Sequence, residues 1–138
     1  MKTAIIGIIS IALILLIASC EDSSKIEFNR YYSNGSAVYQ AHCQNCHGAK
    51  GEGLQGLIPP LMDSAYLKTN KSALACLIKN GIKGKITISN KQFEGEMRAS
   101  GLAPVEIAQV LTYINNSFGN KLGTFTTESV NADLAKCN

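Results

Sequence analysis

The sequence lacks an excess of charge of either sign, and this absence limits its possible partners. Its 138 residues include 13 lysines and arginines against 10 aspartates and glutamates, a formal net charge of +3. No stripe of basic side chains suited to phosphate groups occurs along the chain. We therefore expect no nucleic-acid partner, because that binding depends on clustered positive charge. The chain also lacks internal repeats and a second block of different composition, so we expect one monomeric domain with a modest core.

Long hydrophobic runs are also absent, except for one at the N-terminus that is short for a membrane span. Residues 4–18 read AIIGIISIALILLIA, and as a helix they would reach about 22 Å against a hydrocarbon core of about 30 Å. With the basic Lys2 in front, residues 1–19 are predicted to be a secretory signal peptide.

The signal ends in the sequence IASC, residues 17–20, which resembles the bacterial lipobox. That resemblance implies a lipidated Cys20 as the first residue of the mature chain. The alternative is ordinary cleavage with an unmodified cysteine. The interpretation we favour is an extracytoplasmic lipoprotein, anchored to a bacterial membrane on its periplasmic side.

The rest of the chain divides into three parts. Residues 20–33 are polar, charged and without period, and are predicted to be a flexible tether. Residues 34–118 hold the helical patterns and are predicted to be the domain. Residues 119–138 form a C-terminal extension, in which a short docked helix is predicted from three residues at helical spacing: Val130, Leu134 and Cys137.

Three helices and one short hairpin are predicted within the domain. The helical patterns cover residues 35–43, 71–80 and 104–117. The second stops at Gly81, and the third begins at a proline and carries an apolar stripe at positions i, i+3, i+4 and i+7. The hairpin lies in residues 86–97, where alternating isoleucines precede a Ser89-Asn90 turn. The predicted fold class is therefore small and all-α.

Residues 42–48, HCQNCHG, place Cys43, Cys46 and His47 within about one helical turn. A structural zinc site needs four ligands, usually in two pairs, and no second pair exists in the sequence. A thioredoxin-like site would put the two cysteines at the start of a helix that follows a strand. Here the motif ends a helix and no parallel sheet is predicted, so neither alternative fits the chain well.

Covalent haem accounts for every residue of this CxxCH motif. Two thiols close together can add to the vinyl groups of one porphyrin edge, and the next residue, His47, can bind the iron. Haem c is attached to proteins outside the cytoplasm, and an exported protein reaches that compartment. We predict one covalent haem c held by Cys43, Cys46 and His47. A dihaem peroxidase would need a second CxxCH, and the sequence contains none.

The second axial ligand is predicted to be Met97. It follows His47 after a helix and a loop that can carry the chain around the haem edge. Met62 lies only fifteen residues after His47 and is expected to pack in the core, although it stays an alternative. A sixth position that is open, or filled from outside, is the other alternative.

At this point the chain resembles the class I monohaem cytochromes c, over nearly all of residues 35–118. Gly35 and Tyr39 match the glycine and aromatic of that family's first helix, and Val110 and Tyr113 match the last helix that crosses it. The resemblance implies a small cytochrome c fold with three main helices around the haem. Arg98 departs from the pattern, because a proline often follows the ligand methionine in the family.

The resemblance also implies three further haem contacts. Pro59 lies twelve residues after His47, as in the family, and its carbonyl would accept a hydrogen bond from the second ring nitrogen of that histidine. Leu61 would pack on the haem, and Phe93 would lie near its edge ahead of the ligand methionine.

These ligands predict an electron carrier rather than an enzyme. A His/Met pair leaves no vacant iron position, and the thioether favours ferrous iron and raises the potential. The expected function is one-electron transfer between a redox donor and an acceptor, without catalytic residues. Two alternatives stay open: a haem subunit of a larger oxidoreductase complex, and a gas-binding or catalytic domain with a displaceable methionine.

Two features of the sequence remain after the haem is placed. Lysines that cluster in the middle of the sequence could form a docking surface for an acidic partner, or could be only a solvated surface: Lys50, Lys68, Lys71, Lys79, Lys83, Lys85 and Lys91. Cys76 and Cys137 are the cysteines left over in an oxidising compartment. We predict a disulfide between them that would pin the C-terminal tail onto the second helix.

Overall fold

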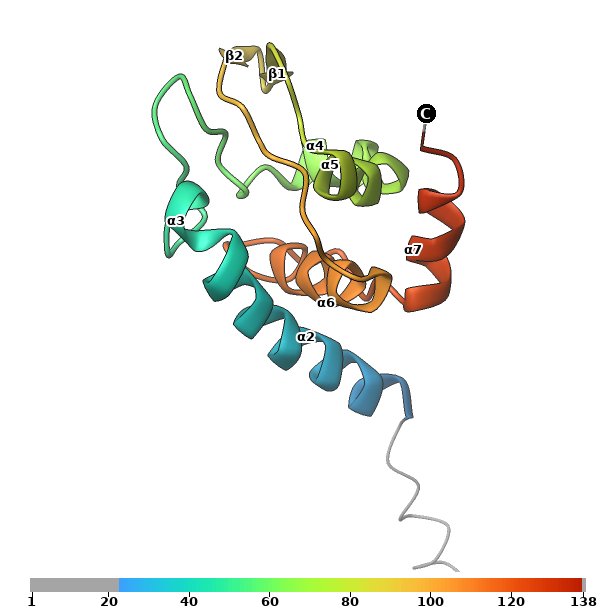
Figure 1. Ribbon diagram of the computed structural model, residues 1–138. Coiled ribbons are helices and arrows are strands. Elements are labelled where there is room, and N and C mark those ends of the chain that lie inside the picture. The colour runs from blue at the N-terminus through green and yellow to red at the C-terminus, as the bar shows by residue number, and fades with distance from the viewer. Residues whose placement is uncertain (1–22, 138) are drawn as a thin grey trace, which may run out of the picture.

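The computed structural model describes residues 23–137, and its regular elements are almost all helical (Figure 1). The predicted signal peptide and Cys20 lie outside the described residues. Within them, no helix is both long and apolar enough to cross a bilayer. The elements in chain order are α2 (Ser23–His42), α3 (Gln44–His47), α4 (Ser64–Thr69), the 3-10 turn η1 (Lys71–Ala73), α5 (Leu74–Asn80), β1 (Ile86–Ile88), β2 (Lys91–Phe93), α6 (Pro104–Ile114) and α7 (Thr127–Leu134).

This order confirms the prediction of a small, mostly helical domain with one hairpin. Strands β1 and β2 pair antiparallel with Ile86 opposite Phe93, and Ser89 and Asn90 form the turn with φ of 48° and 62°. Two positive φ values are what the tight two-residue turns of hairpins require. Helix α6 begins at Pro104 as predicted and ends at Ile114, three residues before the predicted end.

The first helix begins much earlier than predicted. Helix α2 starts at Ser23, so the flexible tether predicted for residues 20–33 is wrong from Ser23 onward. Aromatic side chains at positions i, i+3 and i+4, namely Phe28, Tyr31 and Tyr32, form a narrow stripe that fastens this half of the helix. Tyr31 is 6% exposed. A helix that can pack such a stripe is stable although the rest of its surface is polar.

Helices α2 and α6 cross at Gly35, and this crossing is the centre of the fold (Figure 1). A Cβ atom on Gly35 would lie 2.0 Å from the carbonyl oxygen of Gln109 in α6. The rings of Tyr39 and Tyr113 pack beside the crossing with centroids 5.3 Å apart. The two helix backbones therefore approach closely at this glycine.

The C-terminal extension packs on the domain as predicted. The disulfide between Cys76 and Cys137 joins α5 to the end of the chain, and α7 contacts both α5 and α6. Val130 in α7 and Phe125 before it are fully buried. The backbone N–H of Phe125 donates to Thr112 Oγ1 at 2.9 Å, which satisfies a buried polar group at the junction with α6.

The Gly35→Ala variant tests the crossing. Alanine raises helix propensity by about 1 kcal/mol relative to glycine, yet we expect a net loss of about 1–3 kcal/mol because the new methyl group meets the α6 backbone. Denaturant unfolding of the haem-loaded protein measures the change. Gly101→Ala is the matched control, since a Cβ there has nothing within 4 Å. Equal stability of the two variants would show that the close approach does not limit packing.

Candidate haem site

The CxxCH motif consists of Cys43, the N-cap residue of α3, and the four residues of α3, and it follows directly after the end of α2. The backbone N–H groups of Cys46 and His47 both donate to the carbonyl of Cys43, at 3.1 and 2.9 Å. These bonds hold the two cysteines and the histidine in one helical turn. Cys43 is partly buried and Cys46 is exposed, and neither is in a disulfide. Two unpaired thiols on one turn are what covalent attachment of a porphyrin edge requires.

The ring of His47 is held by the chain that follows it. Its Nδ1 lies 3.2 Å from the carbonyl oxygen of Pro59, the contact that the resemblance implies. A carbonyl can only accept, so Nδ1 carries the proton and Nε2 keeps a free lone pair for a metal. Burial lowers the pKa of His47, against the opposing effect of the Pro59 hydrogen bond. The imidazole is therefore held neutral, in the state that can act as a ligand.

Tyr39 stabilises the end of the motif, a role that was not predicted from the sequence. Its hydroxyl donates to the carbonyl of Gly48 at 2.6 Å, while its side chain is 1% exposed. Burial raises the pKa of Tyr39, so the phenol stays neutral and able to donate. The presence of a tyrosine could have indicated this role in the sequence, because a phenylalanine would fill the same space but could not hydrogen-bond to the residue after His47.

Asn120 fixes the segment after Pro59 and was also missed. Its Nδ2 donates to the carbonyls of Leu61 at 2.8 Å and Ile114 at 3.0 Å, and its Oδ1 accepts from Ser64 Oγ. Asn120 is 2% exposed. Leu61 itself is partly buried against the core. This asparagine therefore joins the end of α6 to the segment that holds His47.

The Met97 loop is fixed by its own backbone. Met97 and Ile82 exchange two hydrogen bonds, N–H to carbonyl, at 2.8 and 3.0 Å. Beside them, a Cβ on Gly81 would lie 2.3 Å from the Met97 carbonyl oxygen. Met97 is partly buried, and Phe93 is 6% exposed at the end of β2. Met62 is 49% exposed, so the expectation that it packs in the core is wrong.

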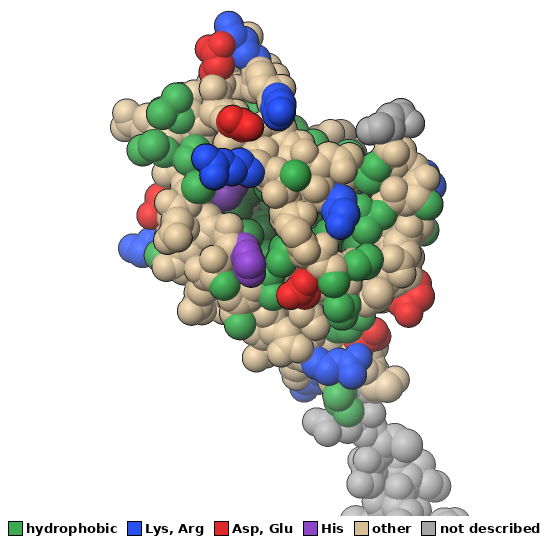
Figure 2. All heavy atoms as spheres, in the orientation of Figure 1, with side chains coloured by type: hydrophobic (Ala, Val, Ile, Leu, Met, Phe, Trp, Pro, Cys, Tyr) green, Lys and Arg blue, Asp and Glu red, His purple; other side chains and the backbone are tan. Residues whose placement is uncertain are grey.

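The surface near the two histidines is hollowed and apolar (Figure 2). Figure 2 shows both histidine side chains at the margin of a hollow with hydrophobic side chains in its floor. The donors available are two thiols, an imidazole with a free Nε2, and a methionine on a fixed loop. Thiols, imidazole and thioether are the protein groups that c-type haem uses, so the residues present fit this cofactor.

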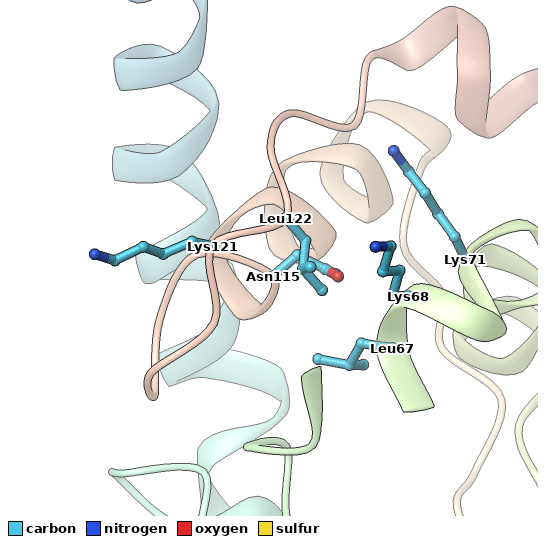
Figure 3. A pocket seen from close by; sticks show the side chains of 6 residues that line it. All are labelled: Leu67, Lys68, Lys71, Asn115, Lys121 and Leu122. Atoms are coloured by element: carbon cyan, nitrogen blue, oxygen red, sulfur yellow. The ribbon is translucent and has the colours of Figure 1, made fainter. Parts of the chain in front are cut away.

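A separate cavity of about 320 Å³ lies between α4 and the end of α6 (Figure 3). It is lined by Leu67, Lys68, Lys71, Asn115, Lys121 and Leu122. None of the predicted haem contacts is among these residues. This cavity is therefore separate from the candidate haem site beside the motif.

The comparisons with known proteins agree with this geometry. Residues 32–118 match the model of the family described as Cytochrome c, which is more than half of the chain. Among proteins with curated descriptions, none matches the chain. Members of the family bind haem c covalently, are typically electron carriers rather than enzymes, and in bacteria are extracytoplasmic. The chain belongs to the cytochrome c family, and it is a haem c protein that carries electrons between redox partners.

Proposed function

We propose that this cytochrome transfers single electrons with His47 and Met97 as its axial ligands, while a lipid on Cys20 holds it to a membrane. The observation that carries the proposal is that hydrogen bonds fix the segments of both proposed ligands. His47 is held through Pro59, and Met97 is held through Ile82. A pair of pre-positioned ligands favours a fast electron carrier, since little has to move when the iron changes charge.

The bound haem supplies a one-electron couple, which a thioether ligand shifts toward the ferrous state. The residues of this chain set the conditions for that couple. The Pro59 carbonyl keeps the His47 ring in one orientation. Phe93 and Leu61 add apolar side chains, which favour the less charged, reduced site. Cys46 is exposed, so it would hold a porphyrin edge near the surface, where a partner could reach it.

The surface beside the motif favours a protein partner. Three of the large hydrophobic side chains that are exposed belong to one stretch after His47: Leu54, Leu57 and Met62. All seven lysines of the predicted docking surface are exposed. Lys85 already pairs with Glu94 at 3.7 Å, which reduces its contribution. Lys68 and Lys71 line the separate cavity, so the charge near the motif comes from the other lysines. Exposed apolar side chains with positive charge nearby suit an acidic redox protein, because charge steers the encounter and apolar contact stabilises it.

The ligand assignment is tested by comparing Met97→Ala with Met62→Ala. We expect Met97→Ala to abolish the far-red absorption band of thioether-ligated ferric haem and to let ferrous haem bind carbon monoxide. Met62→Ala is expected to leave the spectrum unchanged, since that side chain is 49% exposed. A wild-type protein that binds carbon monoxide at once would favour the gas-binding or catalytic alternative.

The support of the Met97 loop is tested at two glycines that share a positive φ. An alanine costs about 1–3 kcal/mol at such a position from backbone strain alone. Gly84 has a φ of +90° and open space around it, whereas Gly81 has a φ of +75° and faces the Met97 backbone. We expect Gly84→Ala to lose stability but keep the far-red band. Gly81→Ala should lose more stability and weaken the band, because the loop has to move. Loss of the band in both variants would refute this role for Gly81.

The docking surface is tested with small oxidants of opposite charge. We expect oxidation of the reduced protein by hexacyanoferrate, an anion, to slow as ionic strength rises, and oxidation by a cationic cobalt–phenanthroline complex to quicken. Lys50→Gln should reduce the salt dependence, because Lys50 is exposed and close to the motif. Lys136→Gln makes the same charge change on the C-terminal extension and should have little effect. Stopped-flow rates that are independent of salt would contradict the steering proposal.

A further inference from the structure

We infer that α2 acts as a rigid spacer that holds the haem site about 30 Å from the lipid-bearing end of the chain, toward a protein partner and away from the bilayer. The inference rests on the proposed lipid anchor at Cys20. It adds a geometric restriction to the proposed function: electrons would pass to and from proteins at a fixed height above the membrane. Redox molecules dissolved in the bilayer would be out of reach.

Helix α2 is long and continuous. The helix runs unbroken over 20 residues from Ser23 to His42, which corresponds to about 30 Å at 1.5 Å per residue. The motif follows at once, because Cys43 is the residue after the last one of α2. In Figure 1, α3 and the hairpin lie at the opposite end of the molecule from the start of α2.

Side-chain contacts fasten the first half of α2 to the rest of the domain. The Tyr31 hydroxyl lies 2.7 Å from Thr127 Oγ1 at the start of α7. The Tyr32 hydroxyl lies 3.1 Å from Ser117 Oγ, and its ring packs against Tyr113 with centroids 5.2 Å apart. These contacts join the helix to both ends of the α6–α7 connection. The start of α2 therefore cannot swing independently of the haem site.

The chain between the proposed anchor at Cys20 and the start of α2 is short. Only Glu21 and Asp22 separate Cys20 from Ser23, and three Cα–Cα steps span at most about 11 Å. A flexible linker would have let the domain turn over and bring either end to the membrane. With so little slack, the end of the molecule that carries Ser23 is the one held at the lipid surface.

The distribution of exposed apolar side chains agrees with this orientation. Among the large hydrophobic residues exposed in the described part, Ile26 is near the start of α2, beside the exposed Lys25. An apolar and a basic side chain suit the boundary of a bilayer. The stretch with Leu54, Leu57 and Met62 follows the motif at the far end of α2. That stretch is therefore left for contact with a protein partner.

The test measures the height of the haem above a bilayer. Full-length protein, acylated and haem-loaded, is reconstituted in phosphatidylcholine vesicles that carry a fluorophore on their headgroups, and quenching by the haem is recorded. A second protein carries a 12-residue Gly-Ser insertion between Asp22 and Ser23, which adds a flexible span of about 19 Å. The matched control carries the same insertion after Asn138. Optical spectra confirm that all three proteins hold haem in the same way.

We expect weak quenching in the wild type and the control, and about a twofold or greater increase when the insertion precedes α2, because the flexible span lets the haem approach the surface. Wild-type quenching equal to that of the linker variant would overturn the inference, since the haem end would already lie at the bilayer. Mass spectrometry of the wild type separates this result from failure of the premise: an unmodified Cys20 would overturn the proposed anchor and the inference with it. The ligand tests at Met97 would be unaffected by either outcome.

Discussion

The backbone contact between α2 and α6 at Gly35 is the constraint on which the rest of the structure depends. Because α2 leads directly into the CxxCH turn, the angle at which it crosses α6 decides where both thiols and His47 point. The same crossing brings Tyr39 under the motif, where its hydroxyl holds the Gly48 carbonyl. A side chain at position 35 would separate the two helices and move His47, the proposed haem ligand, together with them. The glycine is therefore a determinant of the site as well as of the core.

Away from that crossing, the haem site is built mostly from loops, and single side chains replace the missing secondary structure. Pro59 and Leu61 lie in an irregular segment whose carbonyls are bound by His47 and Asn120 respectively. Each of these bonds satisfies a backbone acceptor that a helix or sheet would otherwise satisfy. In the Met97 loop, two backbone hydrogen bonds to Ile82 satisfy the backbone groups of Met97 in the same way. The domain thus fixes the segments of both proposed ligands outside its named helices and strands, and the two segments also meet where the Glu94 N–H donates to the Gly56 carbonyl at 3.1 Å.

Much of this arrangement could be predicted from local patterns, and the remainder depends on contacts between distant residues. Helices α5 and α6 follow from their apolar periodicity, and the Cys76–Cys137 disulfide follows from counting the cysteines left after haem attachment. The start of α2 was mistaken because its aromatic stripe is narrow and charged residues surround it, so its first half looks polar. Asn120 gives no local signal at all, since its role exists only once α6 and the Leu61 segment meet.

The C-terminal extension shows how a small haem domain can gain stability without covering its working surface. Helix α7 buries Val130, and the chain before it buries Phe125, which enlarges a core that would otherwise be small. The disulfide adds to this by restricting the unfolded chain, across a separation of 61 residues. In Figure 1, α7 lies on the opposite side of the domain from α3. Stabilising contacts and the haem-bearing surface are thereby kept apart, and the exposed residues beside the motif are left available for a redox partner.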